Sequence, residues 1–460
     1  MRSDTICAIS TPAGQGGIAV IRVSGKDAVA ICNRICRPAR KSGTLSEQPA
    51  NTVVFGSILR EGRLLDEALA TVFRAPRSYT GEDTVEISCH GSVFIQQELL
   101  KLLMANGCRM AAAGEFTQRA FLNGKLDLSQ AEAVGDLIAS SSAAAHRMAM
   151  RQMRGEFSRQ LSELRRQLLK FTSLIELELD FSEEDVEFAD RNELKQLAGG
   201  IEAAIRRLVT SFDTGNAIKN GIPVAIAGAT NAGKSTLLNR LLKDERAIVS
   251  DVHGTTRDSI EDTVTLEGLL FRFIDTAGIR RTDDAVERLG VERTFRKIEQ
   301  ASIVLWVIDL TADAVPLSEE IAERCRNKRL MLVLNKSDRL TEDALAEKTA
   351  YYRRTGREYT VISAKSDADV SALERRLTDI ARFLHTEGDD VVVSNLRHRE
   401  ALQKTAEALR RVIDGLNAGV SGEFLAQDIR ECMHFLGEIT GEITTDEVLG
   451  NIFGNFCIGK

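Results

Sequence analysis

The segment GATNAGKS at residues 228–235 constrains this chain more than any other. It matches the phosphate-loop pattern G-x-x-x-x-G-K-[ST] and lies between the apolar run VAIA and the helix-forming STLLNRLL. Such a loop aims backbone N–H groups at phosphate oxygens, while Lys234 bridges the terminal phosphates and the Ser235 hydroxyl ligates magnesium. A glycine-rich turn is the alternative, but the context favours a phosphate loop. The residues predicted to bind nucleotide here are Asn231, Ala232, Gly233, Lys234, Ser235 and Thr236.

Two motifs typical of a magnesium-dependent switch follow. GTTRD at residues 254–258 offers Thr256 as a second hydroxyl for magnesium. DTAG at residues 275–278 follows the apolar run FRFI, so Asp275 is expected at a strand end, where its carboxylate holds a magnesium-bound water. Each motif is weak alone, but their order predicts a switch that senses the terminal phosphate. The further contacts predicted from these motifs are Gly254, Thr276, Ala277 and Gly278.

Two later motifs indicate which base is read. NKSD at residues 335–338 follows the apolar run LMLVL, and the Asp338 carboxylate can accept two N–H bonds from guanine but finds no such pair on adenine. In SAK at residues 363–365, the Ala364 N–H can reach the guanine carbonyl. The set therefore predicts GTP rather than ATP. Its residues are Asn335, Lys336, Asp338, Ser363, Ala364 and Lys365.

Two side chains bear on the predicted hydrolysis. Ile279 follows DTAG, and an apolar side chain cannot orient the attacking water. We hypothesise that Glu287 does so, the alternative being a solvated helix carboxylate. The side-chain oxygen of Asn231 could coordinate a monovalent cation that neutralises phosphate charge, or could only pack within its loop.

Composition sets the broad class of protein. At roughly 100 to 200 residues per domain, 460 residues suggest about three domains. No apolar run reaches the roughly 18 residues needed to span a bilayer, which predicts a cytoplasmic protein without membrane association. The eight cysteines include no C-x-x-C pair, and Cys32 and Cys36 are expected on one helix as reduced thiols. A net charge of −7 means that RNA would have to bind at a local basic patch.

Hydrophobic periodicity predicts a multidomain fold. Residues 1–123 read as an α+β domain, with strands such as IAVIRVSG and TVEISCHG and a helix near 93–105. Residues 124–216 are helical, with apolar spacing over 126–138, 148–179 and 194–212. Residues 217–385 alternate strands and helices as a doubly wound α/β GTPase domain does. Residues 386–460 are helical again, so the α/β domain is expected to be inserted into a helical one.

Four segments outside the GTPase motifs carry a resemblance over all 460 residues. They are TPAGQGG at 11–17, SYTGEDTVEISCHG at 78–91, GEFTQRAFLNGKLDLSQAEA at 114–133 and the terminal FCIGK. With them the chain resembles the bacterial MnmE (TrmE) family of tRNA modification GTPases. The alternative, a regulatory or ribosome-assembly GTPase without modification chemistry, shares GTTRD-like loops but lacks these segments.

The resemblance implies a reaction and partners that no residue pattern shows. It implies a homodimer joined through an N-terminal folate-binding domain. It also implies an FAD-dependent partner, MnmG, in a heterotetramer or larger complex through which tRNA is reached. Together they would add an aminomethyl or carboxymethylaminomethyl group to the wobble uridine of certain tRNAs.

The resemblance also implies particular site residues. A formyl- or methylene-tetrahydrofolate would contact Arg22, Glu86, Lys125 and Lys460, each of which is otherwise a plausible surface charge. Cys457 falls in the terminal motif, with a structural or reactive role. Glu287 would be the glutamate that the family uses in hydrolysis. Potassium would be held by Asn231, Ser250, Val252 and Thr255, in a nucleotide-binding loop that includes Asp251 and His253.

Overall fold

The computed structural model describes residues 4–39, 43–180, 191–242, 262–274, 295–313, 317–384 and 391–460. These residues form two compact units. The first combines residues 1–138, 150–202 and 404–460, and the second combines 139–149 and 203–403. None of the helices within the described ranges is long and apolar enough to cross a membrane.

The N-terminal part of the first unit is a seven-stranded sheet of order β3-β4-β5-β6-β2-β1-β7. All neighbouring strands are antiparallel except β1 and β7. Alternate residues of its central strands are apolar, which buries one face. The strands are β1 Ile6–Ile9, β2 Ile18–Ser24, β3 Cys36–Pro38, β4 Thr52–Arg60, β5 Arg63–Phe73, β6 Thr84–His90 and β7 Arg109–Met110.

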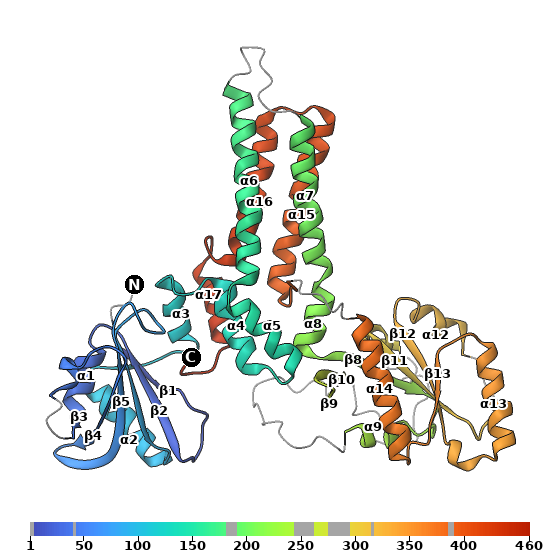
Figure 1. Ribbon diagram of the computed structural model, residues 1–460, viewed down its shortest axis with the longest axis horizontal. Coiled ribbons are helices and arrows are strands. Elements are labelled where there is room, and N and C mark those ends of the chain that lie inside the picture. Colours follow the sequence, from blue (N-terminus) through green and yellow to red (C-terminus); the bar gives the residue numbers. More distant parts are fainter. Residues whose placement is uncertain are drawn as a thin grey trace. The chain divides into compact units, whose positions relative to one another are not determined.

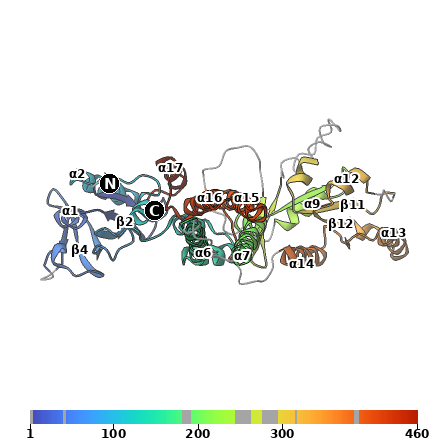
Figure 2. The same cartoon turned by 90° about the horizontal axis from the view of Figure 1, so that it is seen from above.

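Helices α1 (Ala28–Ile35) and α2 (Val93–Ala105) contribute to the core on that face (Figure 2). The predicted helix near 93–105 is confirmed as α2. The expectation that Cys32 and Cys36 share a helix is wrong, because α1 ends at Ile35 and Cys36 begins β3. Phe116, on α3 (Glu115–Leu122), belongs to a separate small core with Ile6 and Ala8 of β1.

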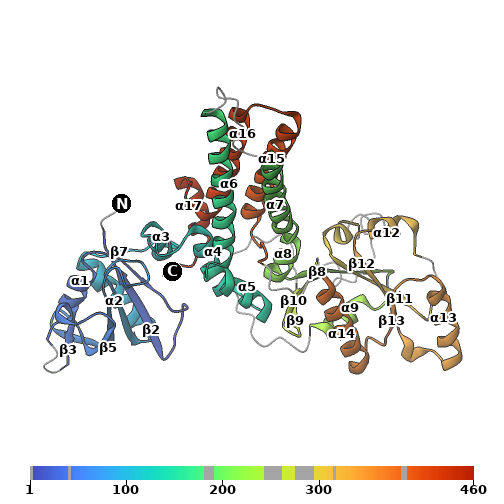
Figure 3. The same cartoon turned by 45° about the horizontal axis from the view of Figure 1, so that its top comes forward.

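Helices make up the rest of the first unit. Helix α6 (Glu156–Asp180) lies along α16 (Gly422–Thr440), and the two remain side by side in Figures 1 and 3. The sequence predicted one helix over 148–179, but the chain turns at Gly155, whose φ is +79°, and two helices result. The other helices wholly or partly in this unit are α4 Leu128–Ala139, α5 Ala143–Met153, α7 Arg191–Thr210, α15 Leu396–Ala418 and α17 Asp446–Gly454.

The second unit contains a six-stranded sheet of order β13-β12-β11-β8-β10-β9. Its strands are parallel except for the β9–β10 hairpin, whose turn Glu267–Gly268 has two positive φ angles, as a two-residue hairpin loop requires. The strands are β8 Ile222–Gly228, β9 Asp262–Leu266, β10 Leu269–Phe273, β11 Ile303–Asp309, β12 Arg329–Asn335 and β13 Tyr359–Val361.

Helices cover both faces of this sheet, as the alternating pattern predicted. Helices α9 (Lys234–Leu241) and α14 (Asp367–Leu384) contribute leucines to one core. Residues at or near α12 (Glu319–Arg324) and in α13 (Glu342–Arg354) pack on the other face (Figure 3). Helix α8 (Phe212–Asn220) leads into β8. The fold is therefore multidomain, with a doubly wound α/β domain inserted between helical segments.

Candidate functional site

The phosphate loop joins β8 to α9 and depends on three special backbone positions. Gly228, with φ +139°, lies against β11, where a Cβ atom would overlap the Val307 main-chain oxygen. Asn231 has φ +59° although it is not glycine, and its side chain is exposed. Gly233 has φ +98°, and a Cβ atom there would overlap the Asn335 side chain. The predicted loop is thus folded in a conformation that its glycines permit.

Lys234, the first residue of α9, lies back across its own loop. Its Nζ donates to the main-chain oxygens of Gly228 at 2.9 Å and Ala229 at 2.6 Å. Burial, followed by the charge of Lys297, lowers the pKa of Lys234. Ser235 and Thr236 follow in the first helical turn, the position at which a phosphate-loop hydroxyl ligates magnesium.

Asn335 connects the phosphate loop to the loops predicted to read the base. Its side chain is buried and donates from Nδ2 to the Ala232 oxygen at 2.8 Å. Its Oδ1 accepts from the Ala364 N–H at 2.9 Å. The amide of Asn335 is therefore occupied by two backbone contacts, and its role in the described geometry is to hold the two loops together.

Asp338 and Ser363 meet at the base-reading end of the sheet. Ser363 Oγ donates to Asp338 Oδ1 at 2.8 Å, and the Ser363 N–H donates to Asp369 at 2.7 Å. Arg240 on α9 donates to the Lys365 main-chain oxygen at 3.1 Å and pairs with Asp367 at 2.6 Å. The predicted guanine contacts from two separate motifs are thus brought together, and Arg240 and Asp369 are supports that the motifs do not include.

Lys336 forms an ion pair with Asp309, the last residue of β11. Lys336 Nζ lies 2.5 Å from Asp309 Oδ2, while Thr311 donates to Asp309 Oδ1 from its N–H at 2.9 Å and its hydroxyl at 2.7 Å. Burial raises the pKa of Asp309, but the hydrogen bonds from Lys336 and Thr311 outweigh it, so the pKa lies below its ordinary value. A strand-terminal aspartate at the carboxyl edge of a parallel sheet is the sequence signal for this residue.

The predicted switch residues, together with Glu287, lie outside the described residues. They are Ser250, Asp251, Val252, His253, Gly254, Thr255, Thr256, Asp275, Thr276, Ala277 and Gly278.

In the first unit, two of the charges implied as folate contacts form one cluster. Arg22 on β2 and Glu86 on β6 are cross-strand partners, and Arg22 Nε donates to Glu86 Oε1 at 2.8 Å. The guanidinium lies 5.1 Å from the Tyr79 ring centroid and 5.5 Å from that of Phe116. Its NH1 atom is buried without a hydrogen-bond partner among the described residues. A buried cation with an unused donor suits an anionic or carbonyl-bearing ligand.

The C-terminal segment docks beside this cluster. The Phe116 N–H donates to the Lys460 main-chain oxygen at 3.1 Å, and Ser10 Oγ donates to the Gly459 oxygen at 3.1 Å. Cys457 has an exposed side chain, and its main-chain oxygen accepts from the Gly114 N–H at 3.4 Å. The Nζ of Lys125 donates to the Pro76 oxygen at 3.0 Å, on the loop that carries Tyr79.

Two residues of the GEFTQR segment, Glu115 and Arg119, belong to a network of ion pairs. Arg119, buried on α3, pairs with Glu115 at 3.0 Å, Glu82 at 3.2 Å and Asp4 at 2.9 Å. Arg109 adds bonds to Glu115 at 2.6 Å and Asp4 at 2.7 Å. Sequence reasoning missed this network, because its members come from four segments whose charges look like ordinary surface residues.

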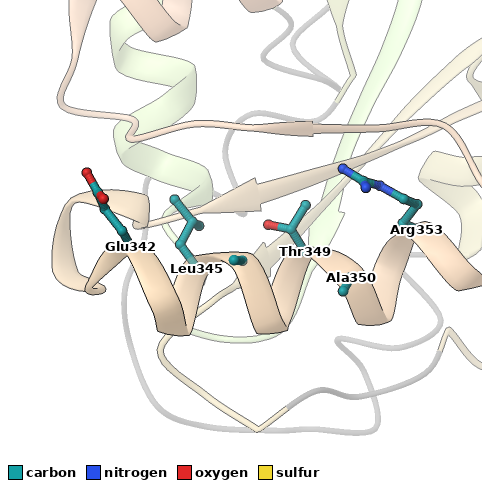
Figure 4. Close-up of a pocket in the computed structure, with 6 residues that line it drawn as sticks. Glu342, Leu345, Thr349, Ala350 and Arg353 are labelled. Atoms are coloured by element: carbon teal, nitrogen blue, oxygen red, sulfur yellow. The ribbon is translucent and has the colours of Figure 1, made fainter.

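A separate depression of about 320 Å³ lies along α13 (Figure 4). Its wall comes from one helix and includes no residue of the predicted motifs. The lining residues are Glu342, Leu345, Ala346, Thr349, Ala350 and Arg353.

The α/β unit, with its phosphate loop at the end of β8 and its base-reading loops at the ends of β12 and β13, defines the class of P-loop GTPases. Family models match two regions of the chain: "GTP-binding protein TrmE N-terminus" over residues 5–125 and "MnmE helical domain" over 128–457. The chain belongs to the MnmE (TrmE) family of tRNA modification GTPases, which are GTP-hydrolysing enzymes.

Relatives named tRNA modification GTPase MnmE are similar over their whole length. The protein from Bacteroides thetaiotaomicron is 57% identical over 100% of both chains, and that from Parabacteroides distasonis is 57% identical over 99% of this chain and 100% of its own. The Christiangramia forsetii protein is 51% identical over 100% of this chain and 99% of its own. Among solved structures, the G domain of the T. maritima FeoB iron transporter covers 35% of this chain and 98% of its own at 21% identity, with a TM-score of 0.24.

Proposed function

We propose that this protein hydrolyses GTP in a potassium-activated cycle that drives tRNA wobble-uridine modification. The main support for GTP binding is the pair of hydrogen bonds that Asn335 makes with the backbone of Ala232 and of Ala364. These bonds join the phosphate loop to the two base-reading loops. Asp338 supplies the carboxylate that distinguishes guanine from adenine.

The metal ions are assigned to side chains and carbonyls of the same unit. Ser235, at the start of α9, and Thr256 would hold magnesium, which would neutralise phosphate charge. Asn231, with Ser250, Val252 and Thr255, would hold potassium. The exposed side chain of Asn231, on a left-handed residue of the phosphate loop, supplies an oxygen donor suited to such a cation.

GTP turnover by the full chain in potassium and in sodium tests this cycle, with Asn231→Ala compared in both salts. Faster turnover in potassium that the variant loses is the expected result. Equal wild-type rates in the two salts would remove the potassium step while leaving the GTPase.

Glu287 is proposed as the residue that orients the attacking water, since Ile279 cannot do so. Glu287→Gln should lower kcat about 100-fold or more while GDP affinity stays within twofold, because general-base assistance contributes on that scale. Normal turnover in this variant would assign the water to another group.

The modification itself is proposed from the family. The chain would act in the cytoplasm as a homodimer with FAD-dependent MnmG, adding an aminomethyl or carboxymethylaminomethyl group to the wobble uridine of certain tRNAs. GTP turnover, and not binding alone, would support the reaction. A non-hydrolysable GTP analogue that sustained full modification would overturn this coupling. Normal wobble uridine after loss of the protein would favour a regulatory or ribosome-assembly GTPase.

The cluster around Arg22 is proposed to hold a formyl- or methylene-tetrahydrofolate, which would supply a one-carbon unit. Arg22 and Glu86 offer a donor and an acceptor, and Tyr79 and Phe116 offer aromatic surfaces to a flat ring. Lys125 and Lys460 are assigned to the charged tail. Calorimetric titration with 5-formyltetrahydrofolate should show binding that Arg22→Gln weakens at least tenfold, with Arg63→Gln, an exposed arginine of the same sheet, as control.

We retain the predicted domain boundaries as part of this proposal. They are residues 1–123 for the folate-binding and dimerisation domain, 124–216 and 386–460 for the helical domain, and 217–385 for the GTPase domain. The two matched regions, 5–125 and 128–457, support a division near residue 123. The second compact unit, which includes 203–403, contains the whole of the proposed GTPase domain.

A further inference from the structure

Asp309 lies outside every nucleotide-binding motif, yet it occupies the centre of the base-reading end of the sheet. It ends β11 directly opposite Asn335 of β12, and the Leu310 N–H donates to the Asn335 oxygen at 3.0 Å. Both oxygens of its carboxylate are engaged, one by Lys336 and the other by Thr311. These contacts on both oxygens fix the orientation of the carboxylate.

The partner of Asp309 is held in an unfavourable backbone conformation. Lys336 has φ +67°, a left-handed value that L residues with side chains rarely adopt. This bend directs the chain from Asn335 into the short turn Ser337–Arg339, which carries Asp338. The side chains of Lys336 and Asp309 are only 21% and 20% exposed, so the ion pair is partly shielded from water. A shielded ion pair at this position stabilises the bend.

We infer that Asp309 is a positioning residue for guanine recognition, acting through Lys336 to hold Asp338 where it meets the base. The inference rests on the proposed GTP site. In this role Asp309 does not touch the nucleotide, and its carboxylate contacts Lys336 and Thr311 rather than the phosphate loop. Its loss should therefore weaken binding of the base and spare the chemical step.

The test is Asp309→Asn, which keeps the shape of the side chain and removes its charge. Asp313→Asn is the matched control, because Asp313 follows the same strand, is exposed and has no partner among the described residues. We expect KM for GTP and Kd for GDP to rise about tenfold, the usual scale for one charge-assisted hydrogen bond, with kcat within twofold. The control should match wild type.

A second readout separates positioning from general destabilisation. IDP lacks the exocyclic amino group of GDP, so the ratio of GDP to IDP affinity reports how well Asp338 meets the base. We expect Asp309→Asn to lower this ratio, whereas damage to the fold would weaken both ligands equally. An unchanged ratio and KM would overturn the inference.

The outcomes remain distinguishable if the first variant misfolds. Thr311→Val removes one hydrogen bond to Asp309 and keeps the ion pair, so it should raise KM about two- to threefold and lower the ratio in the same direction. Normal values in this variant would then count against the inference. Failure of the wild-type chain to bind GDP would instead remove the proposed GTP site.

Discussion

The side-chain nitrogen of Asn335 lies 2.8 Å from the main-chain oxygen of Ala232, so a residue of the base-reading motif directly supports the phosphate loop. Asn335→Ala would leave this oxygen and the Ala364 N–H, both buried, without their partner. We expect the variant to lose about 2 to 4 kcal/mol of stability in the α/β unit and to lose GDP binding. Fluorescence of Trp306 on β11, the only tryptophan, follows unfolding of that unit. Unfolding at the wild-type denaturant concentration would refute the bridging role.

Gly233 should tolerate no side chain. Gly233→Ala forces φ +98° on an L residue and pushes a Cβ atom into Asn335, so we expect a loss of about 2 kcal/mol or more and at least tenfold weaker GDP binding. Gly200→Ala is the matched control, because Gly200 lies within α7 with open space around its Cβ position. That change should instead stabilise the protein by about 0.5 to 1 kcal/mol. Denaturant titration measures the free energy of unfolding of both variants. Equal effects of the two substitutions would contradict the steric role given to Gly233.

The ion network of the first unit should make that unit sensitive to acid. The hydrogen bond and charge of Arg109, aided by Arg119, lower the pKa of Asp4 despite burial. Burial raises the pKa of Glu115, but hydrogen bonds from Arg109, the Ala112 N–H and Arg119 outweigh this effect. The pKa of Glu115 therefore lies below its ordinary value. Because both folded-state pKa values are depressed, their stabilisation is complete above about pH 4 to 5 and declines as the pH falls through the folded-state values.

Circular dichroism melts between pH 7 and pH 3 check this dependence, with Trp306 fluorescence reporting the other unit separately. Glu115→Gln should destabilise the first unit by about 2 to 3 kcal/mol at pH 7, and the difference from wild type should shrink toward pH 3. The exposed Glu163→Gln serves as control. A constant difference across this range would mean that the charge of Glu115 is not what stabilises the network.

Gly459 should be required for docking of the C-terminal segment. It has φ +99°, and a Cβ atom would overlap the Ile9 main-chain oxygen. Gly459→Ala should therefore release the segment, which hydrogen exchange would detect as faster exchange of the Phe116 amide. Gly450→Ala, in α17 with nothing near its Cβ position, should leave that amide protected. Unchanged Phe116 protection in the first variant would show that the docking survives.

Sequence reasoning succeeded where the structure depends on neighbours along the chain. The phosphate loop directly follows its strand, and the apolar runs VAIA at 224–227 and LMLVL at 330–334 predicted β8 and β12. It failed where contacts join distant segments. Strand β7 is two residues long and exists because it pairs with β1, about a hundred residues earlier. The charges of Asp4 and Asp309 resemble surface charges until the fold brings Arg109 and Lys336 beside them.

The docking of the last residues against β1 and α3 has a consequence for synthesis of the protein. Residues 457–460 are translated only after the inserted α/β domain, so the N-terminal domain must wait for the rest of the chain before its contacts at Ser10 and Phe116 are made. A polypeptide that ends after Glu86 but before residue 457 would contain Arg22 and Glu86 and would lack the segment that packs beside them. The N-terminal domain thus reaches its final form only in molecules whose GTPase domain has already been made.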